Sequence, residues 1–295
     1  MFGGAADLPV VLDLIRATPA ASRHILDFGW RLTAPAIAAG RDAVYWQDGG
    51  GRVVGLAAWQ QAWATLDFYV GPGPDAGAVE RAIFAWAGDR FRERDAERGH
   101  PLPYAVEFRD DDQDRQGLIA AHGFVRDAHA SHVGLQHRLD ALPPPVVPDG
   151  FMIRPLGGTA ETAAYAEAHR AAFGSDLMTA PWRERTIGTP LYQPELDLVA
   201  VAADGMLAGF CVGWHDPARG LAQLEPVGVH PRYQRCGLSR ALIAEMLRRF
   251  KDRGASVAVV ETELDLTAAQ AAYGAAGFSQ AHTIWRQEAW AADVT

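Results

Sequence analysis

The residues whose types and order could perform chemistry lie together between residues 225 and 243, in the stretch EPVGVHPRYQRCGLSRALI. An apolar strand pattern ends there at His230 and Pro231, and a loop that contains Gly237 leads into a long pattern with helical spacing. The first turn of a helix leaves backbone N–H groups without acceptors, and the helix dipole adds partial positive charge there. A strand, a glycine loop and a helix start in this order therefore predict a site for a phosphate group.

Arginines surround this predicted site in a chain that is otherwise acidic. Arg232, Arg235 and Arg240 add positive charge to the loop and helix start, whereas the whole chain carries a formal net charge of -9. Such a balance is not suited to general binding of nucleic acid or of an anionic membrane. A cationic small molecule suits this charge better as a partner.

At these residues the chain resembles the GNAT acyltransferase superfamily, whose acyl-CoA diphosphate loop follows the pattern Gln/Arg-x-x-Gly-x-Gly/Ala. The loop stands here as Gln234-Arg235-Cys236-Gly237-Leu238-Ser239, with serine as the last small residue. Serine is small, and its hydroxyl can cap a helix or donate to a phosphate. The resemblance covers residues 151–287, and the layout of the chain is similar to that of tandem acyltransferases of the mycothiol synthase type.

This resemblance implies acetyl-CoA as the acyl donor, no metal, and direct transfer of the acetyl group to a primary amine of a small-molecule acceptor. Main-chain N–H groups at the strand end would polarise the thioester carbonyl. The residues that the resemblance assigns to the donor belong to the strand end, the loop and the first helical turn: Val227, Gly228, Val229, Gln234, Arg235, Cys236, Gly237, Leu238, Ser239 and Arg240.

Two side chains are candidates for the proton transfers that amine acylation needs. Tyr273 stands where the family has a tyrosine that protonates the departing thiolate, although Ala272 replaces the usual leucine and an earlier asparagine is missing. Glu225 lies on the strand that would face the acyl group, and it could accept the amine proton directly or through water. The alternatives are a core aromatic for Tyr273 and, for Glu225, an ordinary strand-edge carboxylate, with water and another carboxylate as the base.

Other reactive side chains of the chain are better explained without catalysis. His230 precedes a proline at a strand end, His215 lies in a turn, and direct transfer needs no acyl-cysteine at Cys236. A different class of function, a non-catalytic module that binds acyl-CoA, stays open. A Rossmann dinucleotide site is disfavoured because the loop has one glycine and comes late in its domain.

The elements that must position these residues form the second of two similar halves. Four prolines between residues 142 and 150 favour a stiff, extended connector, so we expect domains at 1–140 and 150–295 and a linker at 141–149. Two glycine pairs, 55 with 209 and 123 with 277, share a separation of 154 positions, which indicates an internal repeat. The expected fold class is α/β, with two tandem GNAT-like domains, each a mixed, mostly antiparallel sheet flanked by helices.

In the second half, hydrophobic periodicity predicts six strands and four helices. The strands are expected at 151–155, 196–202, 206–214, 221–229, 256–261 and 278–287, and the helices at 159–173, 181–187, 237–253 and 267–276.

The first half keeps this order of elements but lacks the phosphate loop. Residues 70–80 read VGPGPDAGAVE there, and no Lys or Arg occurs from 53 to 80. Asp75 and Glu80 would repel a diphosphate by on the order of 1 kcal/mol or more each. We therefore expect the first half to bind no CoA and to shape the acceptor cleft.

The remaining features bear on where the protein works. Its two cysteines, Cys211 and Cys236, have neither disulfide nor zinc-site spacing. The first residues lack a basic segment followed by an apolar core, and no run is long enough to cross a bilayer. These features predict a cytoplasmic protein and leave its oligomeric state open.

Overall fold

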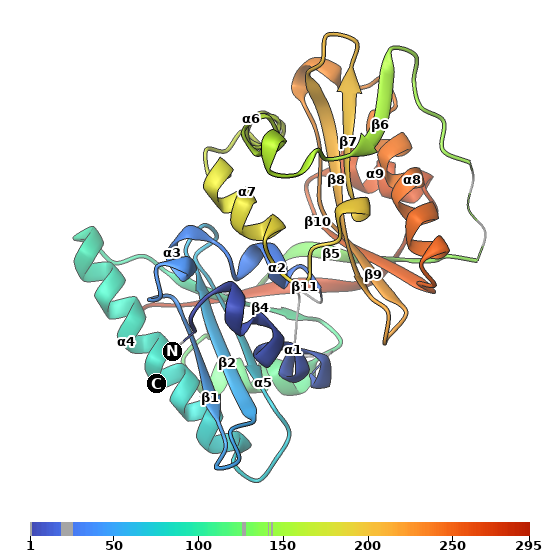
Figure 1. Ribbon diagram of the computed structural model, residues 1–295. Helices are drawn as coiled ribbons and strands as arrows, with labels where there is room; N and C mark the ends of the chain where they lie inside the picture. Colours follow the sequence, from blue (N-terminus) through green and yellow to red (C-terminus); the bar gives the residue numbers. More distant parts are fainter. Residues whose placement is uncertain (1, 19–25, 126–127, 141, 143) are drawn as a thin grey trace. The chain divides into compact units, whose positions relative to one another are not determined.

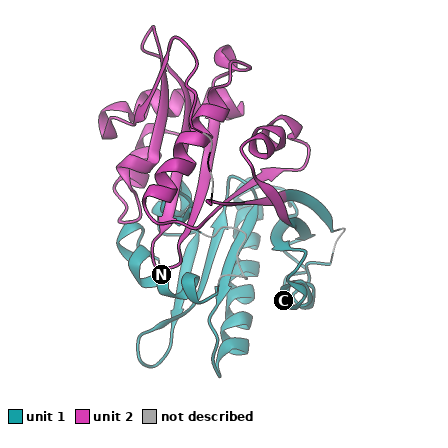
Figure 2. Ribbon diagram, turned by 90° about the vertical axis from the view of Figure 1, so that its right-hand side faces the viewer, with its two compact units in different colours: residues 1–132, 282–295 teal, residues 133–281 magenta. Residues whose placement is uncertain are grey.

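The computed structural model describes residues 2–18, 26–125, 128–140, 142 and 144–295 (Figure 1). Contacts between residues divide the chain into two compact units. Unit 1 comprises Met1–His132 and His282–Thr295, and unit 2 comprises Val133–Ala281 (Figure 2).

Unit 1 is a mixed sheet with the strand order β1-β2-β3-β4-β11, in which β3 and β4 are parallel. The long helix α4 packs Phe84 and Phe91 against Trp59 and Phe68 of the sheet. The elements are η1 (Ala5–Asp7), α1 (Leu8–Ala17), α2 (Phe28–Arg31), α3 (Pro35–Ala38), β1 (Ala43–Gln47), β2 (Val53–Gln60), β3 (Thr65–Val70), α4 (Ala76–Arg98), β4 (Tyr104–Arg109) and α5 (Gln113–Ala121).

Unit 2 is a mixed, mostly antiparallel sheet with the order β5-β10-β9-β8-β7-β6, in which β9 and β10 are parallel. The predicted strands and helices of this half are found within a few residues of their expected bounds. The elements are β5 (His129–Arg138), β6 (Phe151–Pro155), η3 (Gly158–Glu161), α6 (Thr162–Phe173), α7 (Ala180–Ile187), η4 (Pro194–Leu196), β7 (Asp197–Ala202), β8 (Leu207–Asp216), β9 (Leu221–Val229), η5 (Pro231–Tyr233), α8 (Leu238–Asp252), β10 (Val257–Glu263) and α9 (Thr267–Ala275). The last strand of the chain, β11 (Ser279–Ala289), begins in unit 2 and continues into unit 1.

Different helices cover the two faces of the unit 2 sheet, because successive side chains of a strand point to opposite faces. Cys211 of β8 belongs to the core under α8, with Leu242 and Met246. Its neighbour Phe210 contacts the rings of α6, including Tyr165 at 5.0 Å between centroids. Figure 1 shows α6 and α8 on the two sides of these strands.

The glycine pair at the 154-residue separation serves the same packing purpose in both halves. A Cβ at Gly55 of β2 would lie 2.4 Å from Cγ1 of Val79 on α4, and a Cβ at Gly209 of β8 would lie 3.2 Å from Cδ1 of Leu242 on α8. A missing side chain thus lets the long helix of each half approach the sheet. The expected fold of mixed, mostly antiparallel sheets flanked by helices is confirmed.

The final strand of each half does not stay with its own half. Residues of β11 pair with β4 in unit 1, from Ile284 opposite Arg109 to Ala289 opposite Tyr104. Residues 133–138 of β5 belong to unit 2, where β5 neighbours β10. The units therefore differ from the division into 1–140 and 150–295, which was drawn from the prolines and follows the order of the chain.

Candidate active site

An opening between β9 and β10 is the central feature of the site. These parallel strands pair at three positions, the last of which joins Gln223 and Val259. Beyond it, no pairing joins the two strands in the described part of the chain, although β9 stays paired with β8 as far as Val229. Main-chain groups of β9 near Val227 and Gly228 are therefore not used by β10 on that side.

A bulge in β9 shapes this opening. The register against β8 shifts between Cys211 and Gly213, where Glu225 and Pro226 of β9 lie opposite one residue of β8. Proline has no N–H to donate, so a bulge is a place where a strand tolerates it. The Nε1 of Trp214 donates to the main-chain oxygen of Glu225 at 2.6 Å, which fixes the bulge against β8.

The loop after β9 turns twice through left-handed backbone conformations. Arg235 has a φ of 63° and Gly237 a φ of 90°, and α8 begins at the next residue. Ala241 donates the first helical hydrogen bond, to the oxygen of Gly237 at 3.1 Å, and no side chain caps the helix start. The preceding N–H groups thus form a concave set of donors, which suits an anion.

The three arginines near this loop differ in their partners. Arg232 forms an ion pair with Asp204, with Nη1 3.7 Å from Oδ2. Arg235 and Arg240 are exposed, and neither forms a hydrogen bond or ion pair with another residue of the described ranges. These two guanidinium groups are thus available to a ligand anion at the helix start.

The other loop residues contribute backbone rather than side chains. Leu238 is buried in the core, and Gln234 donates weakly to the oxygen of Val229 at 3.5 Å. The Cys236 thiol donates to the oxygen of Tyr233 at 2.8 Å and is exposed. Ser239 is half-buried.

Tyr273 lies on α9 with its side chain almost fully buried, 5.7 Å from the ring of Phe278. Burial raises the pKa of its phenol above the usual value, and the charge of Glu225 raises that pKa further. The phenol therefore keeps its proton and can act as a donor. Glu225 is half-buried on β9.

Two residues of α6 that sequence reasoning did not select lie on the other face of this sheet. Tyr165 is fully buried, and its hydroxyl has no hydrogen-bond partner within the described ranges. His169 follows one helical turn later, and its Nδ1 is likewise buried without a partner there. Burial lowers the pKa of His169 to about 4, with Arg183 and Arg170 contributing, so the ring is neutral at pH 7.

The imidazole of His169 is connected to the opening through one aromatic ring. It stacks on Phe210, with ring centroids 5.4 Å apart. A Cβ at Gly228 of β9 would lie 2.4 Å from Cζ of Phe210, so a glycine is required there. The spacing of Tyr165 and His169 on a predicted helix was the only sequence signal for this pair, and it does not say which face the helix buries.

A buried ion pair fixes α7 to β7 beside this cluster. Arg183 pairs with Asp197, and Tyr192 donates its hydroxyl to Oδ2 of Asp197 at 2.6 Å. The Arg183 guanidinium also lies 3.8 Å from the centroid of the Tyr165 ring. Removing one member would leave a buried charge without its partner, which typically costs about 3–5 kcal/mol.

The remaining residues considered from the sequence have local partners. His230 accepts at Nδ1 from the N–H of Arg232 at 3.2 Å and begins η5. Burial raises the pKa of the Cys211 thiol, which is fully enclosed and therefore a poor nucleophile. Across the residues that the structure describes, no group of three or more metal-ligating side chains comes together, and no helix is long and apolar enough to cross a membrane.

The corresponding opening of unit 1 is different. Strands β3 and β4 pair at one position, Thr65 with Ala105. Past that point the guanidinium of Arg115, from α5, donates through Nη2 to the oxygen of Phe68 at 3.2 Å and lies 3.9 Å from the ring centroid. A protein side chain thus uses the strand oxygen there.

Comparison with known proteins gives matches for the second half and for the whole fold. Residues 162–278 match the acetyltransferase (GNAT) family. The mycothiol acetyltransferase of Nocardia farcinica is 30% identical over 149 residues, which cover 48% of this chain and 49% of that protein. That of Kineococcus radiotolerans is 34% identical over 144 residues, which cover 46% of each. The chain thus spans about half the length of the curated relatives it matches.

Solved structures extend the likeness to both halves. A GCN5-related N-acetyltransferase from Sphaerobacter thermophilus aligns with a TM-score of 0.62 at 21% identity, over 96% of this chain and 93% of that chain. A tandem GNAT protein from the clavulanic acid biosynthesis pathway aligns with a TM-score of 0.64 at 19% identity, over 97% and 95%. At these identities the likeness concerns the fold, and it confirms the expected tandem arrangement.

Proposed function

We propose that the protein transfers an acetyl group from acetyl-CoA to a primary amine of a small molecule. The match of residues 162–278 to the acetyltransferase (GNAT) family supports this proposal. The observation that carries this proposal is the opening between β9 and β10, which begins after Gln223 and Val259 and leads to the loop at Gly237. Main-chain groups of β9 that β10 does not pair with are there available to a thioester, on the strand that runs into the phosphate loop.

The loop and the opening together suit the donor. The N–H groups before Ala241 match the geometry of a diphosphate, and Arg235 and Arg240, which have no ion-pair partner in the described part of the chain, match its charge. Val227, Gly228 and Val229 border the opening, where a main-chain N–H would polarise the thioester carbonyl. Acetyl-CoA acts as the acyl-donating substrate, and the protein supplies position and proton transfer.

The proposed reaction forms one bond and breaks another. The amine nitrogen attacks the thioester carbon, the new N–C bond forms, and the C–S bond breaks. Glu225 accepts the proton of the amine, directly or through a water, and Tyr273 gives a proton to the departing sulfur. The raised pKa of Tyr273 supports the donor role, because its phenol stays protonated.

The acceptor is proposed to approach from the α6 side of β9. Tyr165 and His169 are polar groups without partners in the described ranges, and both lie on the face of the sheet that carries Phe210. Relatives are named mycothiol acetyltransferases, so we include the free-amine form of mycothiol among the acceptors to be tested.

Turnover is the first test of this function. The full chain is incubated with acetyl-CoA and a panel of small primary amines, and free CoA is measured with a thiol reagent after the protein is removed. Release above the no-acceptor rate, with acetylated amine detected by mass spectrometry, supports the enzyme. Tight binding of acetyl-CoA without any product would favour the non-catalytic module instead.

Donor binding has an independent readout in Cys236. This thiol is exposed in the loop, whereas Cys211 is buried and serves as an internal control. We expect iodoacetamide to label Cys236, and acetyl-CoA to slow that labelling at least about tenfold because the diphosphate covers the loop. An unchanged labelling rate at millimolar acetyl-CoA would place the donor elsewhere and remove the basis of the proposal.

A further inference from the structure

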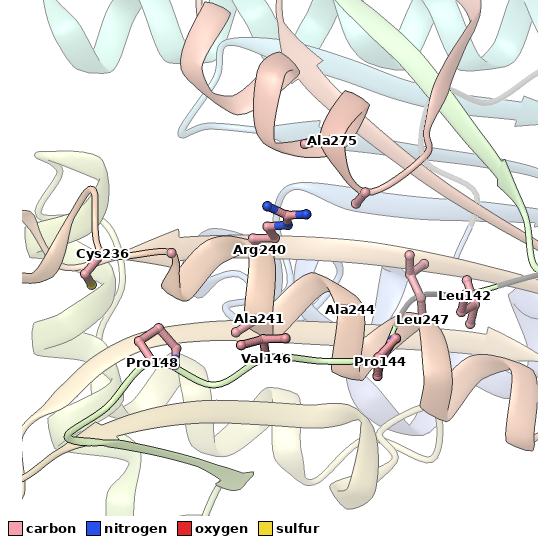
Figure 3. A pocket seen from close by; sticks show the side chains of 12 residues that line it. Leu142, Pro144, Val146, Pro148, Cys236, Arg240, Ala241, Ala244, Leu247 and Ala275 are labelled. Carbon is pink, nitrogen blue, oxygen red and sulfur yellow. The ribbon is translucent and has the colours of Figure 1, made fainter.

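The two faces of the unit 2 sheet offer different surfaces to a ligand. A cavity of about 570 Å³ lies beside α8, where Gly237 of the phosphate loop, Ala241 of α8 and Ala275 of α9 help to line it (Figure 3). The acceptor is proposed to approach from the other face, which α6 covers (Figure 1). The residues that would recognise the acceptor must therefore be sought on α6 and on the strands beneath this helix.

Three aromatic rings gather where α6 ends. Phe210 of β8 stacks on His169 with ring centroids 5.4 Å apart, and its centroid lies 6.1 Å from that of Phe173, the last residue of the helix. The rings of His169 and Phe173, one helical turn apart, have centroids 4.6 Å from each other. At such separations aromatic rings attract one another beyond the effect of burial. The three rings thus form one group, the α6 aromatic cluster.

The α6 aromatic cluster is open at one end. Phe210 and His169 are buried, whereas Phe173 has 48% of its surface exposed. A ligand that covered this ring would remove apolar surface from water, which is favourable. A second observation also points to a ligand: Nδ1 of His169 is buried and has no hydrogen-bond partner within the described ranges, although nearly all buried polar atoms have one.

The cluster borders the strand at which acetyl transfer is proposed. A Cβ at Gly228 of β9 would lie 2.4 Å from Cζ of Phe210 and 3.0 Å from Cβ of Ala172. Ala172 directly precedes Phe173, so α6 ends against β9 at a residue that borders the opening. An acceptor in which few bonds separate the amine from an apolar group can thus contact β9 and Phe173 at the same time.

We infer that the acceptor is an arylalkylamine, whose aromatic ring packs on Phe173 while its amine reaches β9 beside Gly228. This inference rests on the proposed function and makes Phe173 the residue that determines specificity. An aromatic ring extends the cluster through ring–ring attraction, which an aliphatic group of the same size lacks. An amino sugar would instead bring hydroxyl groups to an exposed phenyl ring that cannot hydrogen-bond them.

Steady-state kinetics of the full chain with acetyl-CoA and four amines test this inference. Benzylamine carries an aromatic ring, cyclohexylmethylamine carries a saturated ring of similar size, glucosamine is an amino sugar, and ethanolamine has no ring. With concentrations expressed as unprotonated amine, the kcat/KM of wild type for benzylamine should exceed that for cyclohexylmethylamine by about threefold or more. It should exceed that for glucosamine by about tenfold or more.

Two variants of Phe173 separate the ring from its apolar surface. Phe173→Leu stays apolar but loses the ring, so its KM should rise about threefold or more for benzylamine and stay within about twofold for cyclohexylmethylamine, with kcat for both within about twofold. Phe173→Ser should raise the KM of both ring amines about tenfold and leave that of ethanolamine within about twofold. Met152→Ser, at a residue of β6 that is 56% exposed, should match wild type with every amine.

The outcomes separate this inference from the function on which it rests. If glucosamine were acetylated as well as benzylamine, or if both Phe173 variants kept the wild-type KM values, the inference would be overturned and the acetyltransferase proposal would stand. If no amine were acetylated, the proposed function would fail and the inference with it. Sedimentation shows whether another chain covers Phe173: a wild-type dimer that Phe173→Ser dissociates, with unchanged kinetics, would also overturn the inference.

Discussion

At the scale of single residues, Glu225 and Tyr273 are proposed to move protons in opposite directions. The carboxylate lies on the bulged strand. Burial raises the pKa of the Tyr273 phenol, and the charge of Glu225 raises that pKa further. A neighbouring negative charge favours the neutral form of an acid, so Tyr273 remains a proton donor at any pH where the enzyme would be assayed. The proposed division of roles thus follows from where each group lies.

We predict that Tyr273→Phe lowers kcat by at least about 100-fold and leaves the dissociation constant of acetyl-CoA within about twofold. The ring remains to fill the core beside Phe278, so the loss is that of the proton donor. Steady-state kinetics and calorimetry measure the two quantities, with Tyr45→Phe of unit 1 as the control. An unchanged kcat would make Tyr273 a core aromatic and nothing more.

His169 predicts a dependence of stability on pH. Its pKa is about 4 in the folded chain, below the usual 6.5, because burial penalises the charged ring. Between these values the unfolded chain binds a proton that the folded chain does not, so stability falls as pH drops from about 6.5 to 4. The full effect is about 3 kcal/mol.

His169→Gln should remove this contribution. The free energy of unfolding of both proteins is measured with urea at pH 7.5 and pH 4.5. Between these pH values wild type should lose more stability than His169→Gln. Other histidines with lowered pKa, such as His215, are common to both proteins and cancel in the difference. A constant difference across pH would show that the pKa of His169 is the same in the folded and the unfolded chain.

At the scale of elements, the two ends of α8 separate stability from binding. Gly237 precedes the helix with a φ of 90°, and Gly254 follows it with a φ of 83°. Alanine in a left-handed conformation costs about 1–2 kcal/mol at either position. We therefore expect Gly237→Ala and Gly254→Ala to lose similar stability in urea unfolding.

Their effects on the donor should differ. Gly237→Ala changes the backbone of the phosphate loop and should weaken acetyl-CoA by about tenfold or more in calorimetry, whereas Gly254→Ala should bind as wild type does. Equal affinities in both variants would mean that the loop does not hold the diphosphate.

The same elements show what the sequence can and cannot predict. The loop 234–239 and the helix after it could be predicted because the signal is local: a glycine, arginines and helical spacing within one stretch. The strand β9 was predicted with its observed bounds, but not the bulge at Glu225 and Pro226, which depends on the register against β8. The buried pair Tyr165 and His169 was missed because only tertiary packing decides which face of α6 meets Phe210.

At the scale of the whole molecule, the placement of the last strands sets the unit that can fold. Proline content marks a boundary in the sequence. A sheet, however, is completed by the strand that pairs with its edge, and pairing between distant segments leaves no local signal in the sequence. The core of unit 2 includes Val133 and Leu135 of β5 and also Leu139, which follows this strand. A second half cut at the prolines would therefore lose three core side chains, each worth about 1.5–3 kcal/mol.

We predict that a fragment of residues 133–281 folds, and that a fragment of residues 150–295 does not. The first keeps every strand that the structure assigns to unit 2. The second lacks β5, which leaves the edge of β10 bare, and it carries β11 without β4. The missing core contacts alone are comparable with the whole stability of a small domain, and a bare edge promotes aggregation.

Sedimentation and urea unfolding of the two fragments decide between the contact-based and the proline-based boundaries. Residues 133–281 should be monomeric at micromolar concentration, unfold in one cooperative transition and keep the protection of Cys236 by acetyl-CoA, because the loop and Arg240 lie within this range. Residues 150–295 should aggregate or unfold without cooperativity. If the fragment of residues 150–295 were the stable one, β11 would have to complete the sheet of its own half in solution, and the exchange of last strands would not be a property of the folded protein.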